Sequence, residues 1–108
     1  METRIDGPEV KLLCETLAAI DDAHVISNLL QDCCTIREVQ ELAQRLHVAQ
    51  MLDAGRSYAT IQEETGASAT TIARVSKSLN YGAGGYRYVL DEVLDTGGKL
   101  DDAPGRAI

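Results

Sequence analysis

The sequence predicts an all-α protein that contains a helix-turn-helix. No stretch of the 108 residues alternates apolar and polar side chains as a half-buried strand does. Residues that cap helices recur between apolar segments of helical spacing. Gly66 lies between two short helical segments, with Ile61 five residues before it and Ile72 and Val75 six and nine residues after it. This spacing is typical of two helices that cross at a steep angle around a tight turn.

The N-terminal part predicts two helices with an acidic break between them. The first begins near Gly7-Pro8, because proline is suited to the first helical turn. Asp21-Asp22 ends it and caps the second helix. Apolar residues recur every three or four positions in both segments: Val10, Leu13, Leu17 and Ile20 in the first, and Val25, Ile26, Leu29, Leu30 and Cys33 in the second.

The third helix is predicted to be the longest. Thr35-Ile36-Arg37-Glu38 fits a capping box, in which the threonine hydroxyl and the glutamate three residues later bind each other's backbone N–H groups. Gly55 is a natural C-terminal stop, so the helix spans about 19 residues. Its apolar stripe consists of Ile36, Val39, Leu42, Ala43, Leu46, Ala49 and Met51.

The helix-turn-helix is expected over about residues 57–80. Ser57 and Ser68 cap its two helices, and Gly66 permits the turn. Gln62 stands where such motifs usually have a small residue. A helical wheel turns Ile72, Val75 and Leu79 inward. The opposite face carries Thr70, Ala73, Arg74, Lys77 and Tyr81.

A glycine-rich turn at residues 81–85 separates this motif from a last helix. That helix carries Tyr86, Val89, Leu90, Val93 and Leu94. Residues 1–95 are therefore expected to form a single helical domain, and residues 96–108 a loose C-terminal tail.

The distribution of charge along the chain gives a second indication of function. The chain carries −7 overall, which by itself argues against a nucleic-acid partner. However, residues 65–90 contain no acid and three bases, Arg74, Lys77 and Arg87, whereas every other segment is net negative. The only positive window thus contains the second helix of the motif. A recognition helix in a major groove needs such a face, although a solvated polar helix face would look the same.

Several function classes find no support. No apolar run is long enough for a membrane span, and no apolar segment near Met1 resembles an export signal, so a cytoplasmic protein is expected. Cys14, Cys33 and Cys34 form no metal-binding pattern with His24 or His47, and no metal site is predicted. No nucleophile–base set, paired carboxylates or phosphate loop is present, so no enzyme and no catalytic residue is predicted.

Four stretches of the chain resemble the YerC/YecD family of Trp-repressor-like proteins. They are Leu42–Leu46 (LAQRL), Glu64–Ser68 (ETGAS), Ile72–Val75 (IARV) and Leu79–Gly82 (LNYG), within a match over about residues 8–90. The resemblance implies a Trp-repressor-like helical bundle that forms an intertwined homodimer. It also implies a transcription regulator that binds operator DNA.

The same resemblance implies a position for a small-molecule corepressor. Residues Thr35, Arg45, Arg74 and Ser78 match those that surround the indole corepressor in the Trp repressor proper. A corepressor is then conceivable, but Val75 replaces a glycine there and would intrude on an indole, which argues against tryptophan. Otherwise no cofactor is expected. Arg45 has a second interpretation, as an ordinary ion-pair residue with Glu41 or Asp53.

We therefore expect a sequence-specific DNA-binding regulator, most simply a repressor, that acts as a homodimer on double-stranded operator DNA. Its expected DNA-contacting residues are Ser57, Ser68, Thr70, Ala73, Arg74 and Lys77. A dimer would also cover aliphatic surface that a short chain without Phe or Trp cannot easily bury. The alternative is a helical protein-interaction module with a vestigial helix-turn-helix.

Overall fold

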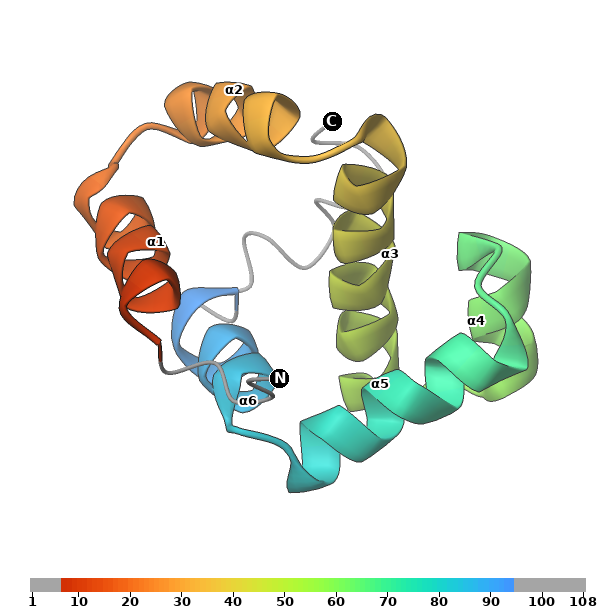
Figure 1. Cartoon of the computed structure of the whole chain (residues 1–108). Helices are drawn as coiled ribbons and strands as arrows, with labels where there is room; N and C mark the ends of the chain where they lie inside the picture. The colour runs from red at the N-terminus through yellow and green to blue at the C-terminus, as the bar shows by residue number, and fades with distance from the viewer. Residues whose placement is uncertain (1–6, 95–108) are drawn as a thin grey trace. The chain divides into compact units, whose positions relative to one another are not determined.

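The computed structural model describes residues 7–94, and all the regular structure in them is helical (Figure 1). This confirms the predicted all-α class for that part of the chain. The elements are α1 (Pro8–Ala19), α2 (Ala23–Cys33), α3 (Ile36–Asp53), α4 (Tyr58–Thr65), α5 (Ala69–Tyr81), α6 (Gly85–Tyr88) and a π-helical turn η1 (Val89–Val93).

The chain divides into two compact units, Met1–Val39 and Gln40–Ile108. The single domain expected over residues 1–95 stays a prediction, and the tail expected at 96–108 lies outside the described residues. None of the helices in residues 7–94 is long and apolar enough to cross a membrane.

The first unit contains α1 and α2, with the break between them where the sequence predicted it. Pro8 begins α1, and the Asp22 carboxylate caps α2 by accepting a hydrogen bond from the His24 backbone N–H at 2.8 Å. No residue of α1 or α2 is buried. Their apolar faces therefore stay accessible within this unit.

α3 begins with the predicted capping box. The Thr35 N–H donates to Glu38 Oε1 at 2.8 Å, and the Glu38 N–H donates to Thr35 Oγ1 at 3.1 Å. Each side chain thus binds a backbone N–H group that the first turn of a helix leaves without a partner.

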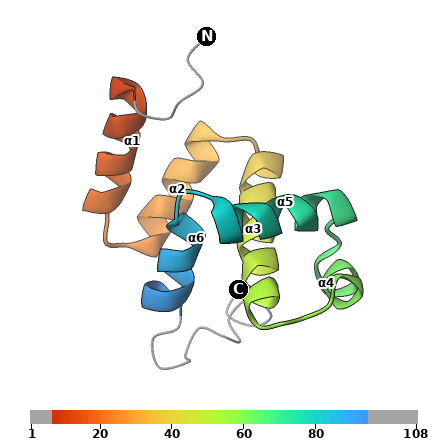
Figure 2. The same ribbon diagram turned by 90° about the horizontal axis from the view of Figure 1, so that it is seen from below.

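The core of the second unit is entirely aliphatic apart from a methionine. Its buried residues are Val48, Ala49 and Met51 of α3, Ile61 of α4, Ala67 of the following turn, Ile72 and Val75 of α5, and Leu90 of η1. α5 crosses α3, with α4 and α6 at its two ends (Figures 1 and 2). The core therefore fixes how α5 is held against the rest of this unit.

Only the C-terminal half of α3 contributes to this core. The predicted apolar stripe places Ala49 and Met51 inside, but Ile36 is 74% exposed and Leu42 is 49% exposed. Val48, which the stripe omitted, is fully buried. Ile36 and Leu42, in the N-terminal half of α3, therefore lie outside this core.

The predicted last helix is present over Gly85–Val93 as α6 followed by η1. Gly84 adopts a φ of +92°, a backbone conformation that favours glycine, in the turn after α5. This turn directs α6 back to pack against α5.

Candidate nucleic-acid interface

α4 and α5 are both capped by the serines that the sequence singled out. The Ser57 hydroxyl accepts from the Thr60 backbone N–H at 3.1 Å, and the Ser68 hydroxyl accepts from the Thr71 N–H at 3.1 Å. Between the helices, Gly66 has a φ of +76°. The two helices and the turn between them therefore begin and end where the sequence predicted.

Thr65 holds the turn together in a way that the sequence analysis missed. Its hydroxyl donates to the Ile61 carbonyl at 2.7 Å and accepts from the Ala67 N–H at 3.0 Å. The Gln44 side-chain amide donates to the Thr65 carbonyl at 3.1 Å, which ties the end of α4 to α3. The only sequence signal was a threonine beside the turn glycine, and Gln44 gave none.

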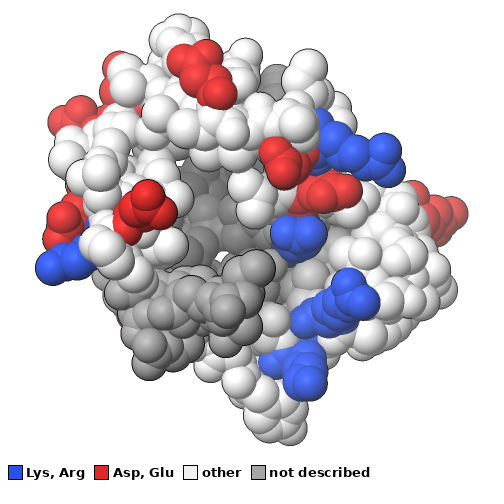
Figure 3. Space-filling view, viewed as in Figure 1, with Lys and Arg blue, Asp and Glu red and all other residues white. Residues whose placement is uncertain are grey.

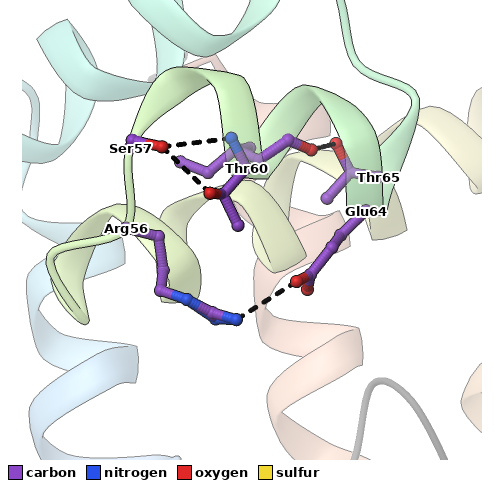
Figure 4. A network of polar contacts seen from close by, with 6 residues as sticks. Arg56, Ser57, Thr60, Glu64 and Thr65 are labelled. Atoms are coloured by element: carbon purple, nitrogen blue, oxygen red, sulfur yellow. Dashed lines mark hydrogen bonds and ion pairs between the residues drawn. The ribbon is translucent and has the colours of Figure 1, made fainter.

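An ion pair spans α4 on its exposed side. Arg56 Nη2 lies 3.2 Å from Glu64 Oε2 (Figure 4). Both side chains are more than 40% exposed, so the pair adds little stability, on the order of 0–1 kcal/mol. Because Glu64 neutralises its charge, Arg56 is a weaker candidate for a nucleic-acid contact than the cations of α5.

α5 has one apolar face and one polar face, as the wheel predicted. Ile72 and Val75 are buried and Leu79 is half-buried, whereas the opposite face is exposed. That exposed face carries Ser68, Thr70, Ala73, Arg74 and Lys77. Among residues 7–94, no acid pairs with Arg74 or Lys77. Figure 3 shows basic side chains gathered over α5 and the adjacent part of α3, with no acidic side chain over α5.

Arg87, the third base of the acid-free window, has a structural role instead. Its guanidinium lies 3.0 Å from Asp53 Oδ1 at the end of α3 and 3.1 Å from Asp91 Oδ1. The hydrogen bond with Asp53, followed by that with Asp91, raises the pKa of Arg87 above its ordinary value. Arg87 therefore ties α6 to α3, which leaves Arg74 and Lys77 as the cations of this window that pair with no acid of residues 7–94.

A pocket of about 350 Å³ lies beside this face. It is lined by Arg45 of α3, by Thr71, Arg74, Val75 and Ser78 of α5, and by Tyr86 of α6. Three of the four residues that the resemblance assigned to an effector thus meet at one pocket. The fourth, Thr35, caps α3 and belongs to the first unit. Thr71 and Tyr86 were not predicted from the sequence to belong to this site.

Arg45 forms an ion pair and also lines the pocket. Arg45 Nη2 lies 4.0 Å from Glu41 Oε1, and both side chains are about half exposed. Asp53, the other acid considered for Arg45, pairs with Arg87 instead. A pair this long and exposed holds Arg45 only weakly, so the guanidinium can still bind a ligand.

Within residues 7–94, no three or more His, Cys, Asp and Glu side chains gather closely enough to hold a metal ion. Cys14 and Cys33 are exposed free thiols, and Cys34 is half-buried.

Over residues 7–94, fold and surface together define an all-helical protein in which α5, the second of two capped helices, presents an exposed face without acidic residues. The family described as "Trp repressor protein" matches residues 8–94. The chain therefore belongs to the Trp repressor family, and the resemblance to the YerC group is confirmed. YerC of Bacillus subtilis (strain 168), described as uncharacterized, is 43% identical over 93 residues, which are 86% of this chain and 89% of YerC.

Two solved structures share the fold. A TrpR-like protein from Eubacterium eligens ATCC 27750 has a TM-score of 0.79 and 38% identity, over 92% of this chain and 98% of that one. A Trp repressor candidate from Staphylococcus aureus has a TM-score of 0.75 and 39% identity, over 79% of this chain and 85% of that one.

Proposed function

We propose that the protein is a sequence-specific DNA-binding transcriptional regulator, a repressor, that uses α4 and α5 as a helix-turn-helix. The exposed face of α5 carries this proposal. It combines two cations without acidic partners among residues 7–94 with hydroxyls and one small residue. The Trp repressor family, to which the chain belongs, supports a regulator over an enzyme.

Each residue of the face has a chemical role in such a complex. Arg74 has the planar fork of donors that reads a guanine edge, and Lys77 and Thr70 bind phosphates or bases. Ala73 lets the helix backbone approach the groove closely. Ser57 and Ser68 lie at helix N-termini, where backbone N–H groups and hydroxyls bind phosphates.

A homodimer completes the proposal. No residue of α1 or α2 is buried, and Leu12, Leu13, Val25 and Ile36 are each at least 46% exposed. We infer that a second copy of the chain covers these apolar side chains, as the family resemblance implies. Two recognition helices would then read half-sites about 34 Å apart, one turn of the DNA duplex.

Selection of bound duplexes from a random-sequence pool tests this function. The expected result is enrichment of a repeated half-site with one-turn spacing, because a two-fold symmetric dimer presents two equal helices. The exposed apolar faces of α1 and α2 favour a second function, a protein-interaction module. Failure to enrich any sequence would favour that module and contradict the DNA-binding proposal.

A further inference from the structure

The pocket between α3, α5 and α6 has the chemistry of an anion site. Arg45 and Arg74 supply two guanidinium groups from different helices, and no carboxylate of residues 7–94 lines the pocket. Arginine binds carboxylates and phosphates through paired, charge-assisted hydrogen bonds. Two such groups facing one space match a ligand with two negative charges.

The hydroxyl groups of the pocket add to this preference. Thr71 Oγ1 accepts a hydrogen bond from the Ser68 hydroxyl at 3.2 Å, so its own hydrogen is available for a ligand oxygen. The Ser78 hydroxyl lines the pocket one turn beyond Arg74. The pocket thus offers donors from two guanidinium groups and two hydroxyls, which suits a ligand rich in acceptor oxygens.

The same lining does not suit tryptophan. Val75 lines the pocket but is only 3% exposed, so its side chain offers little apolar surface for an indole ring to pack on. An amino acid also carries an ammonium group, and among the described residues no lining side chain is an anion that could pair with it. A volume of about 350 Å³ lies at the small end of ligand pockets.

We propose that this pocket binds a small free dianion, inorganic phosphate or a phosphomonoester, and that its occupation opposes DNA binding. Arg74 links the two events, because it belongs both to the pocket and to the exposed face of α5. A bound dianion neutralises Arg74 and adds negative charge beside the DNA backbone. Anion binding stands by itself, whereas its opposition to DNA rests on the proposed function.

Calorimetric titration of the full chain without DNA tests the site itself. Inorganic phosphate and glycerol phosphate are titrated at constant ionic strength, balanced with chloride, above neutral pH so that both are dianions. We expect saturable binding of one anion per chain. Titration of L-tryptophan under the same conditions should give no binding.

Three variants locate the anion. Arg45→Gln removes one guanidinium and should weaken phosphate binding at least about tenfold. Ser78→Ala should weaken it severalfold, which gives a second, milder test within the pocket. Lys77→Gln is the matched control, because Lys77 lies on the same helix but does not line the pocket, and it should change affinity less than about twofold. Circular dichroism confirms that each variant is folded.

The second experiment measures duplex binding by fluorescence anisotropy, with and without phosphate at constant ionic strength. Phosphate should weaken duplex binding by the wild type but not by Arg45→Gln. Arg45→Gln should itself leave duplex affinity in phosphate-free buffer within about threefold of wild type. A larger loss there would assign the pocket to a DNA phosphodiester and overturn the free-dianion proposal.

The two experiments distinguish failure of the anion site from failure of the proposed function. No saturable phosphate binding, or an equal loss in Arg45→Gln and Lys77→Gln, overturns the anion site, because a diffuse positive field would then explain the data. Binding of tryptophan in place of phosphate overturns it too. A chain that binds phosphate but no duplex keeps the anion site, and it removes both the proposed function and the regulatory role.

Discussion

Arg74 and Lys77 are three residues apart on α5, and both are exposed, but only Arg74 also lines the pocket. Their expected contributions to DNA binding differ for chemical reasons. Arginine reads a guanine edge with two hydrogen bonds, whereas lysine is a flexible point charge suited to phosphate.

Arg74→Ala should therefore weaken binding to a selected operator by about 1–3 kcal/mol and relax its specificity. Lys77→Ala should weaken binding to all sequences and reduce the slope of log affinity against log salt by about 1. Fluorescence anisotropy at several salt concentrations measures both. Lys11→Ala, which removes a lysine of α1 that pairs with Glu15, is the control. Unchanged binding in both α5 variants would contradict a DNA contact at this face.

Val75 contributes to the core and also limits the pocket. Val75→Ala removes two buried methyl groups, so we expect a loss of about 2 kcal/mol in the free energy of unfolding. Thr70→Ala on the exposed face should change it by less than about 0.5 kcal/mol. Urea denaturation followed by circular dichroism compares them, and equal stabilities would contradict the burial of Val75.

Much of the site could be predicted at this scale. The family resemblance predicted that Arg45, Arg74 and Ser78 belong to one pocket. Helical spacing would also have placed Thr71 beside them, because it lies three residues before Arg74 and seven before Ser78. Tyr86 could not be predicted, because its position depends on how the turn after α5 directs α6. Sequence spacing also could not show that Arg87 pairs with Asp53, which is 34 residues away.

At the scale of elements, helix ends were well predicted because caps are local. The capping box at Thr35, the serine caps of α4 and α5 and the stop at Gly66 all depend on residues within four positions of one another. The apolar stripe of α3 was less informative. An apolar stripe predicts that a helix face packs against other residues, but it does not indicate whether those residues belong to the same chain.

Gly66 gives a sharp test of the α4–α5 turn. Its φ is +76°, and a Cβ there would meet no atom within 4 Å, so Gly66→Ala tests backbone strain alone. We expect a loss of about 1–2 kcal/mol in the free energy of unfolding. Gly85→Ala is the matched control, because a Cβ there also meets open space and its φ is not positive. Thermal unfolding of both variants checks this, and equal midpoints would contradict the strained turn.

For the whole molecule, the exposed apolar side chains of α1, α2 and the first half of α3 support the proposed homodimer. We expect sedimentation velocity at micromolar concentration to give twice the chain mass. Ile36→Glu should shift the protein toward monomer, because Ile36 is 74% exposed in one chain and its loss costs little within that chain. Tyr81→Glu, at an 84% exposed position on α5, should leave the dimer intact. A wild-type monomer would contradict the homodimer.

The overall charge of −7 has its own consequence at this scale. Acidic surface away from α5 opposes approach to DNA, so nonspecific affinity should be weak and useful binding should depend on two recognition helices acting together.

Charge reversal on α5 tests the proposed contact with DNA. Binding to the selected duplex is measured for the double variant Arg74→Glu with Lys77→Glu, and for Lys11→Glu on α1. We expect the α5 variant to lose more than about a hundredfold in affinity while the α1 variant binds nearly as wild type does. An α5 variant that binds the duplex as tightly as wild type would show that DNA does not contact α5, and would contradict the proposed DNA-binding function.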